Sequence, residues 1–249
     1  MYKAYVIIYK KHNGEYIMEN IKPDKASETL TVFQKPGVFC YGTDAVMLAK
    51  YVIDDITTLS GKNMCDLCTG TGIVPLLLCD SDTSIKCTGF EINTDACKLA
   101  EKSAQVSSYA DRFNVICGDV KNYKDYFVSE QFDFLTCNPP YMTADCGKMC
   151  TADYKTIARH EVLCTLDDIF KAASYMLGTG GDFYLVYRTD RLASLFNAAQ
   201  NNNFQIKKMT LAASSDLPSK AKLALCKAKK GASEGLQLTV SKTDTLCGK

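Results

Sequence analysis

Residues 66–72 read Asp66-Leu67-Cys68-Thr69-Gly70-Thr71-Gly72, between a short apolar run and a stretch with helical spacing. Glycine lets a backbone turn sharply and approach a ligand closely, so this stretch is typical of the first strand-to-helix loop of a ligand-binding sheet. A dinucleotide fingerprint places a third glycine three residues after the second. Pro75 occupies that position, which suits the first turn of a helix and argues against a dinucleotide.

Strand and helix patterns alternate on both sides of this loop. Apolar, β-rich runs predict strands at residues 63–67, 85–92, 113–117, 132–137, 182–187, 204–211 and 221–228, with an earlier strand at 5–9 and a turn at 12–14. Amphipathic spacing predicts helices at residues 73–79, 95–108, 166–177 and 191–200. This alternation without a linker predicts one α/β domain with a mostly parallel sheet, whose ligand lies at the carboxyl ends of the strands.

Acidic residues follow the next two predicted strands. Glu91 lies about 20 residues beyond Gly72, the distance at which an acidic residue binds ribose hydroxyls. Asp119 follows the third strand, where it can accept a hydrogen bond from an adenine amino group. With the glycine loop, these residues predict a site for an adenosine-bearing cofactor. The missing third glycine favours S-adenosylmethionine over NAD.

The fourth strand of this series ends at Asn138-Pro139-Pro140-Tyr141. Proline cannot continue a ladder, so the two prolines hold an extended, rigid loop. This loop aims the Asn138 side-chain oxygen and the Pro139 carbonyl at one point, beside the aromatic face of Tyr141. Two acceptors and a stacking surface suit an exocyclic amino group or a planar amide, and positioning supplies much of the rate acceleration. We therefore predict Asn138, Pro139 and Tyr141 as catalytic residues, and Pro140 and Tyr141 as substrate contacts.

The formal net charge of +1 gives no overall indication of nucleic-acid binding. Residues 203–249, however, hold nine lysines and three acidic residues, or +6, so the first 202 residues carry −5. Within this basic quarter, Lys227, Lys229 and Lys230 form a cluster at a predicted strand end. The cluster has two interpretations: a solvated face, or a binding surface for RNA phosphates.

The 13 cysteines favour a reduced protein. We expect small buried packing residues and scattered thiols. Cys146 and Cys150 would need further ligands to bind a metal, and the sequence offers only two histidines, His12 and His160, and no second Cys-x-x-Cys. We therefore predict no metal. No charged apolar leader opens the sequence and no apolar run approaches ~18 residues, so we expect a cytoplasmic protein without a membrane span.

Taken together, these motifs resemble class I S-adenosylmethionine-dependent methyltransferases with an Asn-Pro-Pro-Tyr motif. Within that class the chain looks most like the tRNA(Val) adenine-N6 methyltransferases, which modify the adenine beside the anticodon. The more specific segments are Gly42-Thr43-Asp44-Ala45-Val46-Met47-Leu48-Ala49 and Ala158-Arg159-His160-Glu161.

The resemblance implies a Rossmann-like class I methyltransferase fold: a mostly parallel seven-stranded sheet with an antiparallel C-terminal strand. Residues 1–40 would form a short N-terminal β extension, and residues 41–249 one methyltransferase domain. The expected cofactor site comprises Thr43, Asp44, Asp66, Gly70, Gly72, Glu91, Asp119 and Asn138. The expected substrate site comprises Pro140, Tyr141, Arg159, Lys227, Lys229 and Lys230. Arg159 and His160 have a second interpretation, as surface residues in the first turn of a helix.

The leading hypothesis is methyl transfer to the N6 amino nitrogen of an adenine in tRNA, without an obligate protein partner. A protein glutamine-N5 or rRNA guanine-N2 methyltransferase would use the same Asn-Pro-Pro-Tyr motif. A non-catalytic S-adenosylmethionine-binding protein that interacts with RNA is the hypothesis from another class.

Overall fold

The computed structural model describes residues 21–140, 164–214 and 220–247. The predicted strand at residues 5–9 and the turn at 12–14 lie outside these ranges. In chain order, the elements are β1 (Lys22–Lys25), β2 (Thr31–Gln34), α1 (Thr43–Asp55), β3 (Asn63–Leu67), α2 (Ile73–Ser81), β4 (Lys86–Glu91), α3 (Thr94–Val106), β5 (Phe113–Cys117), the 3-10 helix η1 (Val120–Asp125), β6 (Phe132–Cys137), α5 (Leu166–Met176), β7 (Leu177–Arg188), the 3-10 helix η2 (Thr189–Arg191), α6 (Leu192–Asn201), β8 (Phe204–Ala213), β9 (Ala221–Lys230), β10 (Gln237–Lys242) and α7 (Thr243–Leu246).

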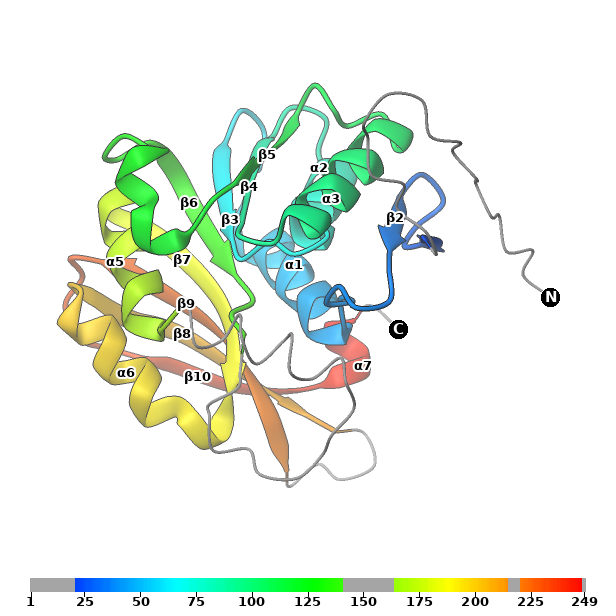
Figure 1. Ribbon diagram of the computed structural model, residues 1–249. Coiled ribbons are helices and arrows are strands. Elements are labelled where there is room, and N and C mark those ends of the chain that lie inside the picture. Colours follow the sequence, from blue (N-terminus) through cyan, green and yellow to red (C-terminus); the bar gives the residue numbers. More distant parts are fainter. Residues whose placement is uncertain (1–20, 141–163, 215–219, 248–249) are drawn as a thin grey trace.

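The main sheet has the strand order β10-β8-β9-β7-β6-β3-β4-β5 (Figure 1). Strands β3 to β7 run parallel, and β9 is antiparallel to both of its neighbours, β7 and β8. The structure therefore confirms the mostly parallel sheet with an antiparallel C-terminal strand. The predicted number of seven strands was wrong, because β10 adds an eighth strand by pairing in parallel with the edge of β8.

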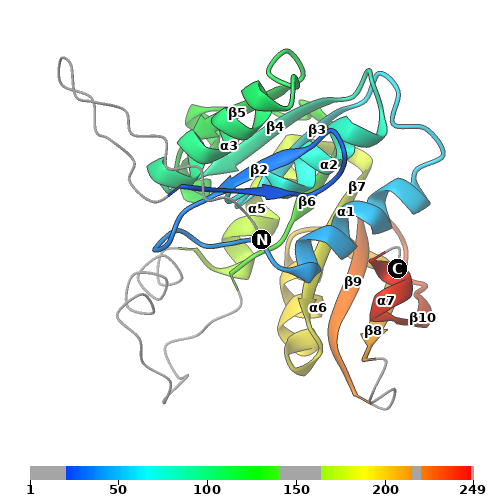
Figure 2. The ribbon, with the colours of Figure 1, turned by 90° about the vertical axis from the view of Figure 1, so that its right-hand side faces the viewer.

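Two layers of helices cover the sheet, and successive residues of the central strands point into opposite layers. In β3, Met64 belongs to the buried cluster that contains the core residues of α1 and α2, whereas Cys65 belongs to the cluster that contains those of α5 and α6. In β7, Tyr184 points to the first layer while Phe183 and Leu185 point to the second. Burial on both faces explains why these strands read as near-continuous apolar runs. Figures 1 and 2 show the sheet between its two helical layers.

A separate two-stranded sheet, β1 with β2, packs against α3 (Figure 2). Its apolar contact joins Phe33 and Val38 to Ala96 and Leu99. The Ser103 hydroxyl of α3 also accepts a hydrogen bond from the Phe33 backbone N–H at 2.9 Å. This contact fixes the chain that leads into α1.

The helix predicted at residues 166–177 ends one residue earlier, at Met176, and β7 starts at once at Leu177. Gly178 and Gly181 therefore lie inside the strand. The pairing of β7 with β6 shifts register between Phe132 and Phe134, so the glycines accommodate an irregular strand start.

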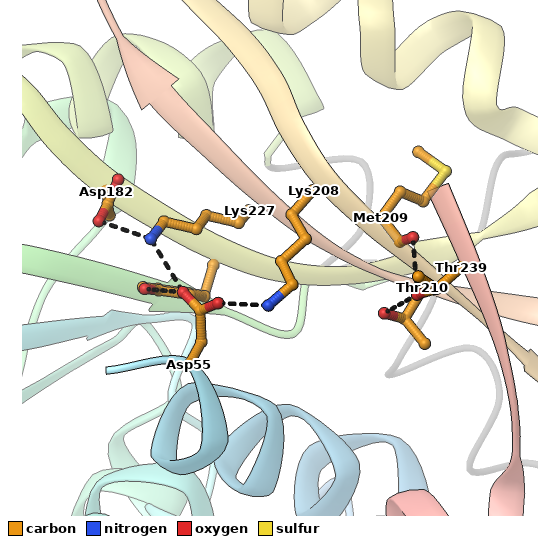
Figure 3. A network of polar contacts seen from close by, with 8 residues as sticks. Asp55, Asp182, Lys208, Met209, Thr210, Lys227 and Thr239 are labelled. Atoms are coloured by element: carbon orange, nitrogen blue, oxygen red, sulfur yellow. Dashed lines mark hydrogen bonds and ion pairs between the residues drawn. The ribbon is translucent and has the colours of Figure 1, made fainter. Parts of the chain in front are cut away.

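An ion-pair cluster lies toward the amino edge of the sheet, since Asp182 of β7 pairs with Phe134 near the start of β6. Figure 3 shows Asp55, Asp182, Lys208 and Lys227 of this cluster. Asp55, at the end of α1, binds Lys208 of β8 at 2.6 Å and Lys227 of β9 at 2.8 Å. Asp182 of β7 binds Lys227 and Lys229, each at 2.9 Å. We call these five residues the amino-edge cluster. It pairs acidic groups of the first 202 residues with lysines of the basic C-terminal quarter.

Burial alone would raise the pKa of Asp55, but hydrogen bonds from Lys208, Lys227 and the Tyr184 hydroxyl outweigh it and hold the pKa at about 2. A carboxyl group with a depressed folded-state pKa stabilises the fold above its ordinary pKa, and this contribution is lost as the pH falls from about 4 to 2.

Asp55→Asn is expected to lower the free energy of unfolding at pH 7 by about 2 kcal/mol, and to flatten its decline between about pH 4 and 2. Urea denaturation along a pH series measures both effects. Asp54→Asn is the matched control, since Asp54 is exposed and its one ion pair within the described ranges is with Lys50, one helical turn away, a contact worth less than about 0.5 kcal/mol. Equal losses in the two variants would contradict this account.

Candidate active site

The strands β5, β4, β3 and β6 lie side by side and end at the carboxyl edge of the sheet. Leu67, the last residue of β3, pairs with Phe90 on one side and with Cys137 on the other, and Glu91 pairs with Cys117. The glycine loop, Glu91, Asp119 and Asn138 follow or end these strands. The register therefore brings to one edge the residues that the sequence places far apart.

The glycine loop needs its two glycines for different reasons. Gly70 and Gly72 both have positive φ, 57° and 82°, a region that other residues enter at a cost. A Cβ on Gly72 would lie 2.8 Å from Cε1 of Phe113, so Gly72 permits close packing of the loop on β5. A Cβ on Gly70 would meet no atom within 4 Å, so Gly70 borders open space.

Glu91 braces this loop from the end of β4. One carboxylate oxygen accepts the Gly70 backbone N–H at 2.8 Å, and the other accepts the Asn93 backbone N–H at 2.9 Å. Each carboxylate oxygen can accept two hydrogen bonds, so the same group is also suited to hydroxyl donors. The position of Glu91 is thus fixed beside the open space at Gly70.

Asp66, in β3, supports the glycine loop through two hydrogen bonds. Its side chain is buried, and its two oxygens accept hydrogen bonds from the hydroxyls of Thr69 at 2.7 Å and Thr136 at 2.6 Å. Burial raises the pKa of Asp66 to about 6, against the lowering effect of these two hydrogen bonds. Asp66 thus joins β3, the loop and β6, and no sequence pattern had indicated Thr69 or Thr136 as its partners.

Asp119 starts the 3-10 helix after β5, where its side chain accepts the Lys121 backbone N–H at 2.9 Å. The preceding Gly118 donates its N–H to the Glu91 carbonyl at 2.8 Å, which ties this turn to the end of β4. A Cβ on Gly118 would lie 2.6 Å from the Phe90 ring. Glycine at this position therefore allows the turn that carries Asp119 to pack against Phe90 at the carboxyl edge.

Asn138 follows β6 and contacts the start of α1. Its amide nitrogen lies 3.1 Å from one oxygen of Asp44, and the other oxygen of Asp44 accepts the Ala45 backbone N–H at 2.9 Å. Pro139 is buried and Pro140 is exposed, so the loop is anchored on one side only. Thr43 is exposed at the first position of α1. The structure thus joins the segment at residues 42–49 to the Asn-Pro-Pro-Tyr motif, a contact that the sequence did not predict.

The clustered lysines lie elsewhere. Lys229 pairs across the sheet with Asp182 at the amino edge, and Lys227 pairs with Tyr184. Lys227 and Lys229 belong to the amino-edge cluster, and Lys230 donates to the carbonyls of Ser174 and Leu177, each at 2.6 Å. The structure therefore does not bring these three lysines to the edge that carries Asn138. Their intramolecular partners explain the local concentration of charge.

Several predicted residues lie outside the described ranges: Tyr141, Cys146, Cys150, Arg159 and His160. Of the cysteines within those ranges, most are buried and all are free thiols. Burial raises the pKa of the Cys137 thiol, beside Asn138. Across the same ranges, His, Cys, Asp and Glu side chains form no group suited to a metal ion. No helix in the described part of the chain has the length and apolar character of a membrane span.

Comparison with known proteins identifies the class. The family model of the methyltransferase small domain matches residues 29–208, and the chain belongs to this family. The curated relatives include a tRNA1(Val) (adenine(37)-N6)-methyltransferase of Porphyromonas gingivalis, 29% identical over 62% of this chain and 60% of that protein. A Bacteroides fragilis protein of the same name is 28% identical over 69% of each chain. The match thus spans less than two thirds of the first of these relatives.

Solved structures share the fold. A predicted O-methyltransferase from Agrobacterium tumefaciens superposes with a TM-score of 0.63 at 19% identity, over 80% of this chain and 86% of that one. TrmN from Thermus thermophilus gives a TM-score of 0.58 at 17% identity, over 78% of this chain and 52% of that one. These similarities confirm the Rossmann-like methyltransferase fold that the sequence predicted.

Proposed function

We propose that the protein is an S-adenosylmethionine-dependent methyltransferase that modifies the N6 amino group of an adenine in tRNA, beside the anticodon. The observation that carries this proposal is the meeting of the glycine loop, Glu91 and Asn138 at one sheet edge, in a chain of the methyltransferase small domain family. The tRNA substrate and the adenine target come from the names of the relatives.

The residues at the carboxyl edge fit the cofactor. The open space at Gly70 leaves room for a ligand against the backbone, and the fixed Glu91 carboxylate beside it is suited to two ribose hydroxyls. Asp119 would bind the adenine amino group, and Thr43 and Asp44 would border the site from α1. When bound, S-adenosylmethionine supplies an electrophilic methyl group. We assign Asp66 a positioning role through Thr69 and Thr136 rather than direct contact.

Asn138 and the Pro139 carbonyl would then hold the two hydrogens of the target amino group. Its lone pair is delocalised into the ring, and two acceptors favour the pyramidal form in which the nitrogen attacks. Preorganised acceptors and alignment supply the acceleration, and the nitrogen releases one proton to solvent. Tyr141 would stack on the base beside Pro140, and Arg159 would bind a phosphate. Lys227, Lys229 and Lys230 are left out of this proposed RNA surface because their partners lie at the amino edge.

The purified chain is expected to transfer label from S-[methyl-³H]adenosylmethionine to unmodified tRNA, and nucleoside mass spectrometry is expected to yield N6-methyladenosine. Using the purified chain alone also tests our proposal that no obligate protein partner is needed. Thermal stabilisation by S-adenosylhomocysteine checks cofactor binding separately. In a cell, fractionation is expected to recover the protein with cytoplasmic tRNA.

The alternatives give different products in the same assay. N2-methylguanosine in rRNA would favour the guanine enzyme, and label in a release-factor peptide would favour the glutamine enzyme. Cofactor binding without any labelled product would favour the non-catalytic protein. Each of these results would overturn the proposal of an adenine-N6 tRNA methyltransferase.

A further inference from the structure

The contact between Asp44 and Asn138 joins residues 94 positions apart in the sequence. Asp44 lies in the first turn of α1, and Asn138 directly follows β6. The amide nitrogen Nδ2 of Asn138 lies 3.1 Å from Oδ2 of Asp44. Oδ1 of Asp44 accepts the Ala45 backbone N–H at 2.9 Å, so both carboxylate oxygens have defined roles.

This contact determines which way the Asn138 amide faces. A carboxylate only accepts hydrogen bonds, whereas the amide donates through Nδ2 and accepts through Oδ1. Nδ2 must therefore face Asp44, which places Oδ1 on the opposite side of the side chain. Rotation of the amide by 180° exchanges two atoms of nearly equal size, so shape alone does not select this orientation.

The position of Asp44 is itself fixed. The helix that carries it is anchored in the core by Met47, Leu48 and Val52. At Gly42, just before the helix, a Cβ would lie 2.7 Å from Oδ1 of Asp44, so the glycine provides room for this carboxylate. A negative charge in the first turn is also favoured by the helix dipole.

We propose that Asp44 is a positioning residue that orients the Asn138 amide, so that an acceptor and not a donor faces the amino group of the substrate. The inference rests on the proposed function and deepens it. An amide in the reverse orientation would present N–H groups to an amino group that is itself a donor. Asp44 thus contributes to the methyl-transfer step without contacting the methyl group.

The test exchanges the two side chains singly and together. In Asp44→Asn, the side chain keeps its shape but can donate as well as accept, so it no longer selects one orientation of the Asn138 amide. The kcat is expected to fall ~10- to 100-fold, while the dissociation constant of S-adenosylmethionine changes little. Asn138→Asp alone places two carboxylates side by side, which raises the pKa of the pair, so its kcat is expected to increase as the pH is lowered. The double variant Asp44→Asn/Asn138→Asp swaps donor and acceptor: the amide on α1 donates to the carboxylate after β6. An acceptor oxygen of that carboxylate then faces the substrate again, and kcat is expected to exceed that of both single variants.

Asp44→Ser is a second variant in case the asparagine variant does not fold, and it is expected to lose kcat similarly because serine also donates. Asp54→Asn, on the exposed side of the same helix, is the control and is expected to keep wild-type kcat. Wild-type kcat in Asp44→Asn, a double variant no better than the single ones, or loss of cofactor affinity in proportion to kcat would each overturn the proposal. If the wild-type protein binds cofactor but does not methylate tRNA, the proposed function fails instead.

Discussion

Asn138→Ala is expected to lower kcat for tRNA methylation by about 100- to 1,000-fold, the range seen when one preorganised polar group is removed from an active site. The variant removes the acceptor for the amino hydrogens and the partner of Asp44. Glu91 and the glycine loop keep their mutual contact, so the dissociation constant of S-adenosylmethionine is expected to change by less than about threefold. Single-turnover rates and calorimetric titration with S-adenosylmethionine measure the two quantities.

Asn63→Ala serves as the control, because Asn63 is the first residue of β3 and thus lies at the opposite edge of the sheet. Its amide donates to the Gln131 carbonyl at 3.2 Å, far from the carboxyl ends of the strands. This variant is expected to retain kcat. An Asn138→Ala variant that methylates at the wild-type rate would refute the role assigned to the Asn-Pro-Pro-Tyr motif.

The two loop glycines are expected to respond differently to alanine. Gly72→Ala would strain a φ of 82° and bring Cβ to 2.8 Å from the Phe113 ring. Strain and overpacking together are expected to lower the free energy of unfolding by about 2–4 kcal/mol. Urea denaturation measures this loss, and cofactor binding is expected to decline with it because the loop cannot keep its shape.

Gly70→Ala is the matched variant, since its Cβ would meet no protein atom within 4 Å. The positive φ alone is expected to cost about 1–2 kcal/mol of stability. The added methyl group would instead occupy space that we propose for the cofactor, and affinity for S-adenosylmethionine is expected to fall at least ~10-fold by loss of a close backbone approach. Unchanged affinity in Gly70→Ala would place the cofactor elsewhere.

Local sequence patterns predicted the central strands and the carboxyl-edge residues because parallel sheets impose strong local signals. Buried strands are apolar throughout, and the residues that end them fall at one edge whatever the strand order. Strand β10 was missed because its outward-facing Leu238 and Val240 are exposed, and its short alternating pattern follows a turn-rich stretch. The strand is held in the sheet by its pairing with β8, and local composition does not predict that pairing.

Contacts between distant residues were not predictable from one sequence. Nothing near Asp44 indicates that Asn138 is its partner, and nothing near Thr136 indicates the buried Asp66. The cluster of Lys227, Lys229 and Lys230 allowed two interpretations because its partners come from other elements: Asp55, Asp182 and the carbonyls of Ser174 and Leu177. Electrostatic roles depend on three-dimensional neighbours, whereas strand and helix patterns depend on neighbours in the chain.

The amino-edge cluster also constrains the order in which the protein can fold. The ion pairs of Asp55 with Lys208 and Lys227 span 153 and 172 residues of sequence. Contacts of such long range slow folding, because a large loop must close before they form. During synthesis, α1 leaves the ribosome long before β8 and β9, so Asp55 has neither of its lysine partners until most of the chain has emerged. These ion pairs can therefore form only as a late event, when β8 and β9 have joined the sheet beside β7.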